Sequence, residues 1–297
     1  MKPPPFAYHD PQSIPEVVGL LSRFENTKLL AGGQSLMPML NMRFVQPDHV
    51  IDLNRVAGLS FIRENDGALE IGAMTRQREL EFSEIVRRRC PLLHEAIALV
   101  GHRQTRNRGT IGGSLCHLDP AAELVAVGAA LDAALTVSGP EGTREMEFAA
   151  FPVAYMTPAI DLTELLTAVR LPFWPEGHGF AFVEFARRHG DFAIVSAAAL
   201  LTENAAGTIT RASVTLGGMG VAPVRARAVE AALVGQRPED KLLREACESC
   251  RTFEAVEDIH APASYRQHLA AVMARRALER ARGRLASRRA APGATDA

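Results

Sequence analysis

The sequence lacks the features that mark secreted, membrane-spanning or strongly charged proteins. It has four cysteines in 297 residues, Cys90, Cys116, Cys247 and Cys250, too few and too scattered for a disulfide framework. No apolar run approaches the roughly 20 residues of a membrane span, and the first residues lack the apolar segment of a secretory signal. The net charge is only -1, which argues against a general nucleic-acid or membrane-surface role. We therefore expect a protein of the reducing cytoplasm.

The residues before 57 alternate between helix-like and strand-like runs. Ser13 and Glu16 form an S-x-x-E box, which predicts the start of a helix. A strand, a helix and a second strand are then expected at 28–31, 35–43 and 49–53. Such a unit is usually right-handed with parallel strands, so an N-terminal βαβ subdomain is predicted at 1–56.

After residue 57 the pattern changes to hairpins and helices. Asp66-Gly67 separates two strand-like runs and predicts a tight hairpin turn. The breaker-rich stretch "FWPEGHG" at 173–179 predicts a boundary, and three strand-like and then three helical runs follow it. The expected division is a second subdomain at 57–175, a C-terminal α+β domain at 176–286 and a flexible tail at 287–297.

Two glycine loops, "AGGQS" at 31–35 and "TIGGS" at 110–114, lie where one element gives way to another. Glycine permits positive φ and close backbone approach, and successive free N–H groups before a helix can bind an anion. Gln34, Ser35, Thr110 and Ser114 can add side-chain hydrogen bonds. The loops together predict a diphosphate site, and an ordinary tight turn is the alternative for each alone.

Three stretches together resemble the FAD-binding medium subunit of the molybdenum hydroxylases: "AGGQSLMPMLNMRFVQPDHVIDLNRV", "TIGGSLCHLDPAAEL" and "FARRHGDFAIVSAA". This is the family of carbon monoxide dehydrogenase medium subunits and xanthine dehydrogenase flavoproteins, and the resemblance runs from about residue 3 to 285. It implies an α+β chain with a vanillyl-alcohol-oxidase-type (PCMH-like) FAD-binding fold of two subdomains. A C-terminal domain with a three-stranded antiparallel sheet and helices would follow.

The resemblance also implies which residues bind FAD. The first loop would contact the diphosphate through Ala31, Gly32, Gly33, Gln34, Ser35 and Leu36, and the second through Thr110, Ile111, Gly112, Gly113 and Ser114. Glu123 corresponds to the family's acidic residue after the second loop, which is usually Asp, and Leu166 to an apolar contact near the flavin. His117 is expected to border the isoalloxazine ring. Because the flavin carries the redox chemistry, no catalytic side chain and no metal are expected on this chain.

By the same resemblance, the chain would be the FAD-containing electron-transfer subunit of a heterotrimeric dehydrogenase. Its partners would be a large subunit with a molybdenum cofactor and a small subunit with two [2Fe–2S] clusters, arranged as a dimer of heterotrimers. Electrons would leave to an external acceptor. The substrate stays open among carbon monoxide, a purine and an N-heterocycle. The alternatives are a stand-alone flavin oxidase or dehydrogenase and a non-catalytic nucleotide-binding module.

Two further pairs of residues can be interpreted either as chemical sites or as structural features. Cys247 and Cys250 form a C-x-x-C within a helical run, and a buried pair is favoured over a redox or zinc site because no second ligand pair accompanies them. His117 and Asp119 could be an acid–base pair, but a loop that shapes the cofactor pocket is favoured.

Basic residues gather in two places. Arg103, Arg106 and Arg108 precede the second glycine loop and can neutralise a diphosphate, pair with acidic groups of a partner or lie on a solvated surface. The last helical run is strongly basic, and a solvated face is its favoured interpretation. Nucleic-acid binding is not expected, given the balanced total charge.

Overall fold

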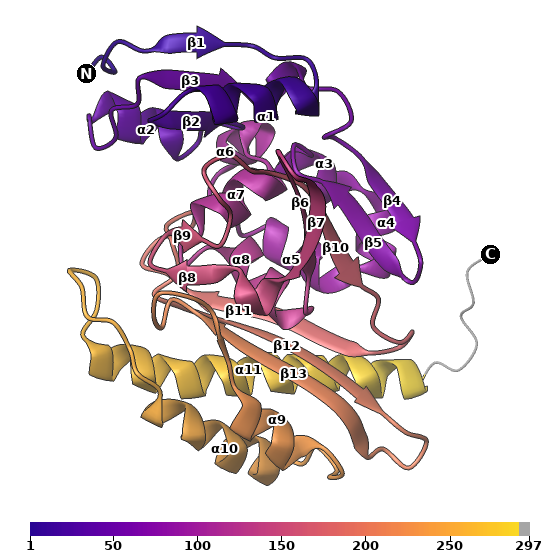
Figure 1. The fold of residues 1–297 in the computed structure, drawn as a ribbon. Helices are drawn as coiled ribbons and strands as arrows, with labels where there is room; N and C mark the ends of the chain where they lie inside the picture. The colour runs from indigo at the N-terminus through magenta and orange to yellow at the C-terminus, as the bar shows by residue number, and fades with distance from the viewer. Residues whose placement is uncertain (291–297) are drawn as a thin grey trace. The chain divides into compact units, whose positions relative to one another are not determined.

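The computed structural model describes residues 1–290, which Figure 1 shows as a ribbon. The chain separates into two compact units and passes between them several times. The first unit comprises Met1–Arg89, Val100–Leu118 and Asp132–Pro172, and the second comprises Cys90–Leu99, Asp119–Leu131 and the residues from Phe173 onward. Two segments of the predicted second subdomain therefore belong to the same unit as the C-terminal part. The subdomain boundaries themselves stay predictions.

The N-terminal part of the first unit is a small parallel sheet with two helices. Its strands lie in the order β1-β3-β2, and both pairings are parallel. The predicted parallel βαβ unit is therefore confirmed, and β1 is an addition to it. The elements are β1 (Ala7–His9), α1 (Ile14–Arg23), β2 (Thr27–Leu30), α2 (Leu36–Asn41), β3 (His49–Asp52) and the 3-10 turn η1 (Leu53–Arg55).

Helix α1 begins where the S-x-x-E box predicts. The Ser13 hydroxyl accepts a hydrogen bond from the Glu16 backbone N–H, and the Glu16 carboxylate accepts one from the Gln12 N–H at 2.9 Å. The first bond satisfies an N–H group that a helix start otherwise leaves unpaired, and the second fixes the residue that precedes the cap. Val17 and Leu21, one turn apart, are buried on the inner face of the helix.

A five-stranded antiparallel sheet, in the order β4-β5-β10-β6-β7, forms the rest of the first unit. The predicted hairpin turn is confirmed: Asp66 and Gly67 join β4 to β5, and both have positive φ, 45° and 70°. The strands are β4 (Ile62–Asn65), β5 (Ala68–Gly72), β6 (Ala134–Gly139), β7 (Gly142–Glu147) and β10 (Leu165–Pro172), with a separate pair β8 (Pro152–Ala154) and β9 (Thr157–Pro158). The helical elements are α3 (Gln77–Phe82), α4 (Glu84–Arg89), α6 (Arg103–Arg108), α7 (Ile111–His117) and the 3-10 turn η2 (Phe148–Ala150).

The second unit is built on an antiparallel sheet in the order β11-β12-β13-β14. The three predicted strands are confirmed, and the two-residue strand β14 extends the sheet by one. Strand β12 is almost wholly buried, which explains its nearly continuous run of small apolar residues. The strands are β11 (Gly179–Phe185), β12 (Val195–Glu203), β13 (Ile209–Gly217) and β14 (Val224–Arg225).

Helices cover both faces of this sheet (Figure 1). Helix α11 packs so closely that a Cβ on Gly179 would lie 2.1 Å from the Ala281 carbonyl oxygen. On the opposite face, the Ser213 hydroxyl donates to the Ala130 carbonyl at 2.7 Å. One face carries α9 (Arg227–Leu233), α10 (Asp240–Glu248), the 3-10 turn η3 (Ser249–Thr252) and α11 (Ala263–Ala290), and the other α5 (Pro91–Ile97) and α8 (Glu123–Ala130).

The C-terminal helix is longer than predicted. Residues 287–290, which the sequence places in a flexible tail, are the last residues of α11, and the rest of that tail, 291–297, lies outside the described residues. The basic helix is also tied to its own unit, because Arg282 pairs with Asp240 and Arg284 with Glu95.

Within residues 1–290, no helix combines the length and the apolar character that crossing a membrane requires.

Candidate functional site

The first glycine loop joins the end of β2 to the start of α2. Gly33 has φ +72°, in the left-handed region that favours glycine. Its carbonyl accepts the hydrogen bond of the Met37 N–H at 3.1 Å, which starts the helix. The side-chain amide of Gln34 donates to the Gly32 carbonyl at 3.2 Å. Hydrogen bonds to the loop's own carbonyl groups therefore stabilise its turn.

The N–H groups of this loop are, by contrast, unused. Among residues 1–290, those of Gly32, Gly33, Gln34 and Ser35 donate to no other group, and the Ser35 side chain makes no capping bond. Unpaired N–H groups in succession, just before a helix, are suited to bind an anion. The first loop therefore fits the diphosphate that the sequence predicts for it.

The second glycine loop differs, because the N–H groups of residues 111–114 all donate inside the protein. The Thr110 hydroxyl caps α7 by accepting from the Gly113 N–H at 3.0 Å. The other three donate to carbonyl groups: Ile111 to Thr75 at 3.2 Å, Gly112 to Ala73 at 2.8 Å and Ser114 to Thr110 at 3.1 Å. The carbonyl groups that follow β5 accept two of these four N–H groups, and the contact of this loop with the FAD diphosphate stays a prediction.

The two loops nevertheless lie side by side. A Cβ on Gly32 would lie 2.3 Å from the Arg108 carbonyl oxygen, and a Cβ on Gly113 would lie 3.4 Å from the Ala31 Cβ. A Cβ on Gly112 would likewise lie 2.7 Å from the Ala73 carbonyl oxygen. Glycine is therefore required at 32 and 112 by the protein's own backbone, because no larger residue permits this packing.

Two polar residues that the sequence analysis did not single out connect the loops. The Asn54 side-chain amide donates to the Ala31 carbonyl at 3.1 Å. The Arg76 guanidinium donates to the Asn54 side-chain oxygen and to the Arg108 carbonyl. Asn54 lies in η1, two residues after β3, and the end of β3 lies beside that of β2, so the parallel pairing could have indicated it. The sequence around Arg76 carries no comparable signal.

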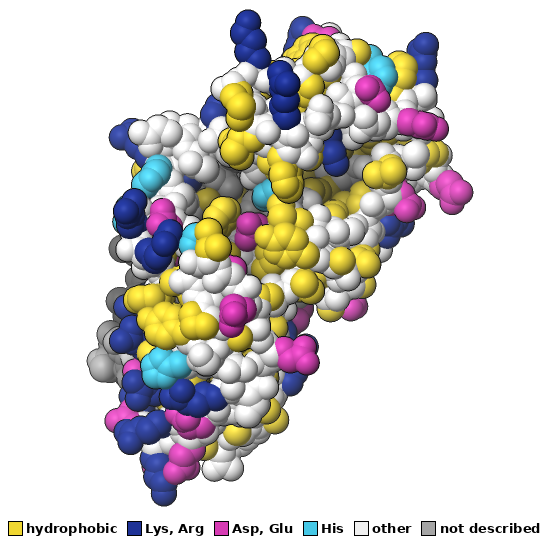
Figure 2. Space-filling model, turned by 90° about the vertical axis from the view of Figure 1, so that its left-hand side faces the viewer, with side chains coloured by type: hydrophobic (Ala, Val, Ile, Leu, Met, Phe, Trp, Pro, Cys, Tyr) yellow, Lys and Arg dark blue, Asp and Glu magenta, His cyan; other side chains and the backbone are white. Residues whose placement is uncertain are grey.

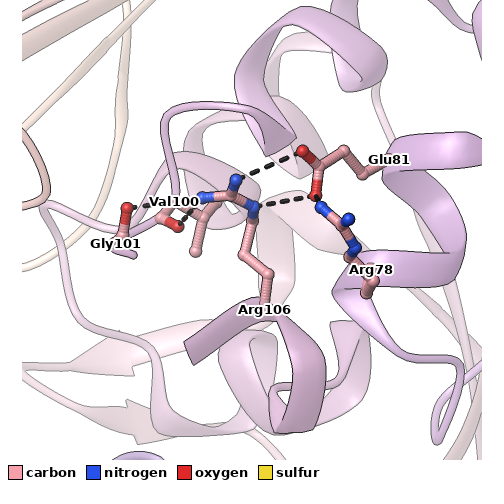
Figure 3. A network of polar contacts seen from close by, with 5 residues as sticks. All are labelled: Arg78, Glu81, Val100, Gly101 and Arg106. Atoms are coloured by element: carbon pink, nitrogen blue, oxygen red, sulfur yellow. Dashed lines mark hydrogen bonds and ion pairs between the residues drawn. The ribbon is translucent and has the colours of Figure 1, made fainter. Parts of the chain in front are cut away.

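Arg106 has a structural role, which removes it from the predicted diphosphate-binding or partner-facing residues. Its buried guanidinium makes two hydrogen bonds to Glu81, at 3.0 and 3.2 Å, and a third to the Val100 carbonyl at 3.0 Å (Figure 3). Arg78 adds an ion pair to the same carboxylate. These partners, Arg106 first, lower the pKa of Glu81. The network fixes α6, which leads into the second loop, against α3.

The remaining predicted contacts do not all lie in one unit. His117 is the last residue of α7, and Leu166 is buried in β10, both in the first unit. Glu123 is the buried first residue of α8 and belongs to the second unit. The Asp119 carboxylate accepts the Ala121 N–H at 2.9 Å, as expected of a residue that shapes a loop. FAD contacts at His117, Leu166 and Glu123 stay predictions.

The C-x-x-C pair is structural, as predicted. Cys247 and Cys250 are both free and buried where α10 passes into η3. Burial raises the pKa of each thiol to about 12, so neither is ionised at neutral pH. In the part of the chain that the structure describes, no group of three or more His, Cys, Asp or Glu side chains is placed to hold a metal ion.

Two family models cover nearly all of the chain. Residues 4–174 match the FAD binding domain in molybdopterin dehydrogenase, and residues 180–281 match the CO dehydrogenase flavoprotein C-terminal domain. Among curated proteins, the chain is 39% identical to the 6-hydroxypseudooxynicotine dehydrogenase complex subunit alpha of Paenarthrobacter nicotinovorans, over 95% of this chain and 96% of that protein. It is 35% identical to the carbon monoxide dehydrogenase medium chain of Hydrogenophaga pseudoflava, over 96% of this chain and all of that protein.

Solved structures agree with these matches. A chain of carbon monoxide dehydrogenase from Hydrogenophaga pseudoflava superposes with a TM-score of 0.93 at 37% identity, covering 96% of this chain and 99% of that one. A chain of quinoline 2-oxidoreductase from Pseudomonas putida 86 gives 0.91 at 33% identity, covering 96% and 100%. These matches show that the chain belongs to the FAD-binding flavoprotein family of the molybdopterin dehydrogenases.

Proposed function

We propose that the first glycine loop binds the diphosphate of FAD. The observation that carries this proposal is the row of N–H groups at Gly32, Gly33, Gln34 and Ser35, which donate to nothing among residues 1–290. In the proposal these groups donate to phosphate oxygens, and Leu36 begins the helix whose N-terminus adds partial positive charge. The turn at Gly33 and the Gln34 side-chain bond keep this backbone in the required shape before the cofactor arrives.

The second loop has a different task in this proposal. The N–H groups of residues 111–114 have partners within the protein, so Ile111, Gly112 and Gly113 are proposed to contact the diphosphate by packing beside the first loop. Ser114 offers a hydroxyl in place of the amide common in the family, and Thr110 supports this loop through its cap. His117 and Leu166 are proposed to contact the flavin, and Glu123 to bind FAD as the family's acidic residue.

The chain is proposed to act as the electron-transfer subunit of a molybdenum-containing dehydrogenase. When bound, FAD supplies the redox chemistry, and the chain's residues hold it in place and exclude other ligands. We propose a large subunit with a molybdenum cofactor and a small subunit with two [2Fe–2S] clusters as partners, in a dimer of heterotrimers with an external electron acceptor. Several similar proteins are themselves named as subunits or medium chains, and the match to this chain covers 96% to 100% of their length.

The surface and the cysteines support the remaining parts of the proposal. On the face drawn in Figure 2, basic and acidic side chains are interspersed, which supports a role without nucleic acid. All four cysteines are free, which supports a reducing compartment such as the cytoplasm.

The decisive experiment is to purify the tagged chain from its own cells and to analyse the flavin and metal content of each co-purifying chain. We expect stoichiometric FAD on this chain, together with a large molybdenum-containing chain and a small iron–sulfur chain. A yellow protein without partners would contradict the subunit role and favour a stand-alone oxidase. A colourless protein that takes up no FAD would contradict the flavin site itself.

A further inference from the structure

The backbone of Arg76 is fixed to the segment that leads into the second glycine loop. Arg76 precedes α3 and pairs with Thr110 in an isolated antiparallel bridge. The next residue, Gln77, donates its N–H to the Gly109 carbonyl at 2.8 Å. Arg76 therefore cannot move away from the second loop without breaking this pairing.

The side chain of Arg76 extends from there toward the first loop. One guanidinium nitrogen donates to the Arg108 carbonyl, the same oxygen against which Gly32 packs. Another donates to the Asn54 side-chain oxygen, and Asn54 in turn donates to the Ala31 carbonyl. An unbroken chain of hydrogen bonds thus runs from one loop to the other.

Asn54 is itself held in a fixed orientation. The Asp52 carboxylate accepts hydrogen bonds from both the backbone N–H and the side-chain amide of Asn54. The same Asp52 carboxylate accepts the Tyr8 hydroxyl at 2.7 Å. Because Asp52 fixes the orientation of this amide, its oxygen accepts from Arg76 and its nitrogen donates to the Ala31 carbonyl.

The charge of Arg76 lacks a hydrogen-bonded counterion. Its guanidinium is partly buried, and both acceptors of its side-chain bonds are neutral, a carbonyl and an amide. Within the described residues it takes part in no ion pair, since the nearby Glu79 carboxylate accepts the backbone N–H instead. Burial, with the neighbouring Arg108 charge, lowers the pKa of Arg76, so an anion beside it would be stabilised.

We propose that Arg76 is a positioning residue for the diphosphate of FAD: it fixes the separation of the two glycine loops and supplies the positive charge beside them. The inference rests on the FAD-binding function proposed above and adds a residue that no loop motif contains. The planar guanidinium is needed because it reaches two acceptors at fixed angles, which an ammonium group does not reproduce.

The test uses the full-length chain stripped of flavin and titrated with FAD and, separately, with ADP, which shares the diphosphate but lacks the flavin. We expect Arg76→Gln to weaken both ligands by a similar factor, about tenfold to a hundredfold. The matched control is Arg63→Gln, because Arg63 makes a two-bond ion pair with Glu70 on the β4–β5 hairpin of the same unit. The control should keep wild-type affinity for both ligands.

Two milder variants keep the test decisive where Arg76→Gln fails to fold. Arg76→Lys retains the charge but loses the planar guanidinium that reaches two acceptors. Asn54→Ala retains Arg76 but removes the hydrogen bonds that link it to the first loop. Each should weaken ADP binding, and combining Asn54→Ala with Arg76→Lys should weaken it by less than the product of the two single effects. Thermal unfolding of each flavin-free variant separates loss of stability from loss of affinity.

Wild-type affinity for FAD and ADP in Arg76→Lys and Asn54→Ala would overturn the positioning role while leaving the FAD site intact. A wild-type chain that bound neither ligand would overturn the proposed function itself, and this inference with it. Equal weakening of ADP by Arg76→Gln and by the Arg63→Gln control would also count against the proposal, since it would indicate a general effect of removing an arginine.

Discussion

In the first glycine loop the N–H groups of residues 32–35 have no partner among residues 1–290, whereas in the second those of residues 111–114 all donate within the protein. Both loops carry two glycines before a short helix, so their sequences suggest one role. The difference comes from their neighbours. The end of β5 lies beside the second loop and supplies the carbonyl groups of Ala73 and Thr75, while no such strand end reaches the first loop's N–H groups.

The comparison shows that a glycine pair before a helix does not by itself leave its N–H groups without a partner. At Gly32 and Gly112 the absence of a side chain permits backbone-to-backbone packing. Only at Gly33 does the left-handed φ require glycine for its conformation. The unpaired donors, rather than the glycines, therefore distinguish the two loops.

The largest expected effect is at Gly32. Gly32→Val should abolish FAD retention and lower the free energy of unfolding by about 3 kcal/mol or more, because its side chain would overlap the Arg108 carbonyl. Gly113→Val should also lose FAD with less damage to the fold, since its Cβ would meet only the Thr110 hydroxyl within 3 Å. The flavin-to-protein ratio and urea unfolding measure both quantities. Stoichiometric flavin in Gly32→Val would break the assignment of the first loop.

A smaller effect is expected at Thr110. Thr110→Ala removes the cap of α7 and should lower the free energy of unfolding by about 1 kcal/mol. Because the capped N–H is not one of the proposed phosphate donors, FAD affinity should change far less than in Gly32→Val. Thr110→Ser, which keeps the hydroxyl, is the control. A Thr110→Ala variant that lost FAD but not stability would mean that the hydroxyl binds the cofactor directly, and the two loops would then be more alike than their backbones suggest.

The smallest effect concerns Glu184, on β11 of the second unit. Burial raises the pKa of the Glu184 carboxyl to about 7, and one of its oxygens is buried without a hydrogen-bond partner. The folded chain thus keeps a proton that the unfolded chain releases near its ordinary pKa of 4.5. The resulting stability is complete at lower pH and is lost as the pH rises through about 7.

Relative to Glu184→Gln, which does not titrate, the wild-type chain should lose at most about 1 kcal/mol between pH 5 and 8, since solvent screens a carboxyl that is partly exposed. Urea unfolding of both flavin-free proteins across this range measures the difference, and ADP affinity should be equal in the two. Parallel stability curves would show that Glu184 does not hold the proton. A change in ADP affinity would mean that the diphosphate site is not confined to the loops.

Local signals in the sequence were enough to predict the elements whose conformation is set by neighbouring residues. The S-x-x-E box located the start of α1, Asp66-Gly67 located a hairpin, and the alternation around 28–53 gave the parallel unit. What escaped prediction depends on partners distant in sequence. The three-residue strand β1 has too little pattern to recognise, and the role of Arg106 is set by Glu81, a residue 25 positions earlier.

The candidate site likewise has features that the sequence predicts and features that it does not. The two loops were found from their glycines, and the resemblance gave their cofactor. The use of the second loop's N–H groups was not predictable, because hydrogen bonds to Ala73 and Thr75 exist only once β5 is in place. The segments 90–99 and 119–131 are apolar helices in sequence, and nothing local indicates that they pack on the sheet of the second unit.

Because segments 90–99 and 119–131 belong to the second unit, no single cut divides the chain into its two units. A protease cut between Pro172 and Phe173, at the edge of the breaker-rich stretch, would not release two self-sufficient halves. The N-terminal fragment would carry α5 and the wholly buried run Glu123–Gly128 without the sheet they cover, and the C-terminal fragment would have one sheet face bare. The nicked halves would stay associated or precipitate. Only together, as in a split-protein reassembly, would they regain the native fold.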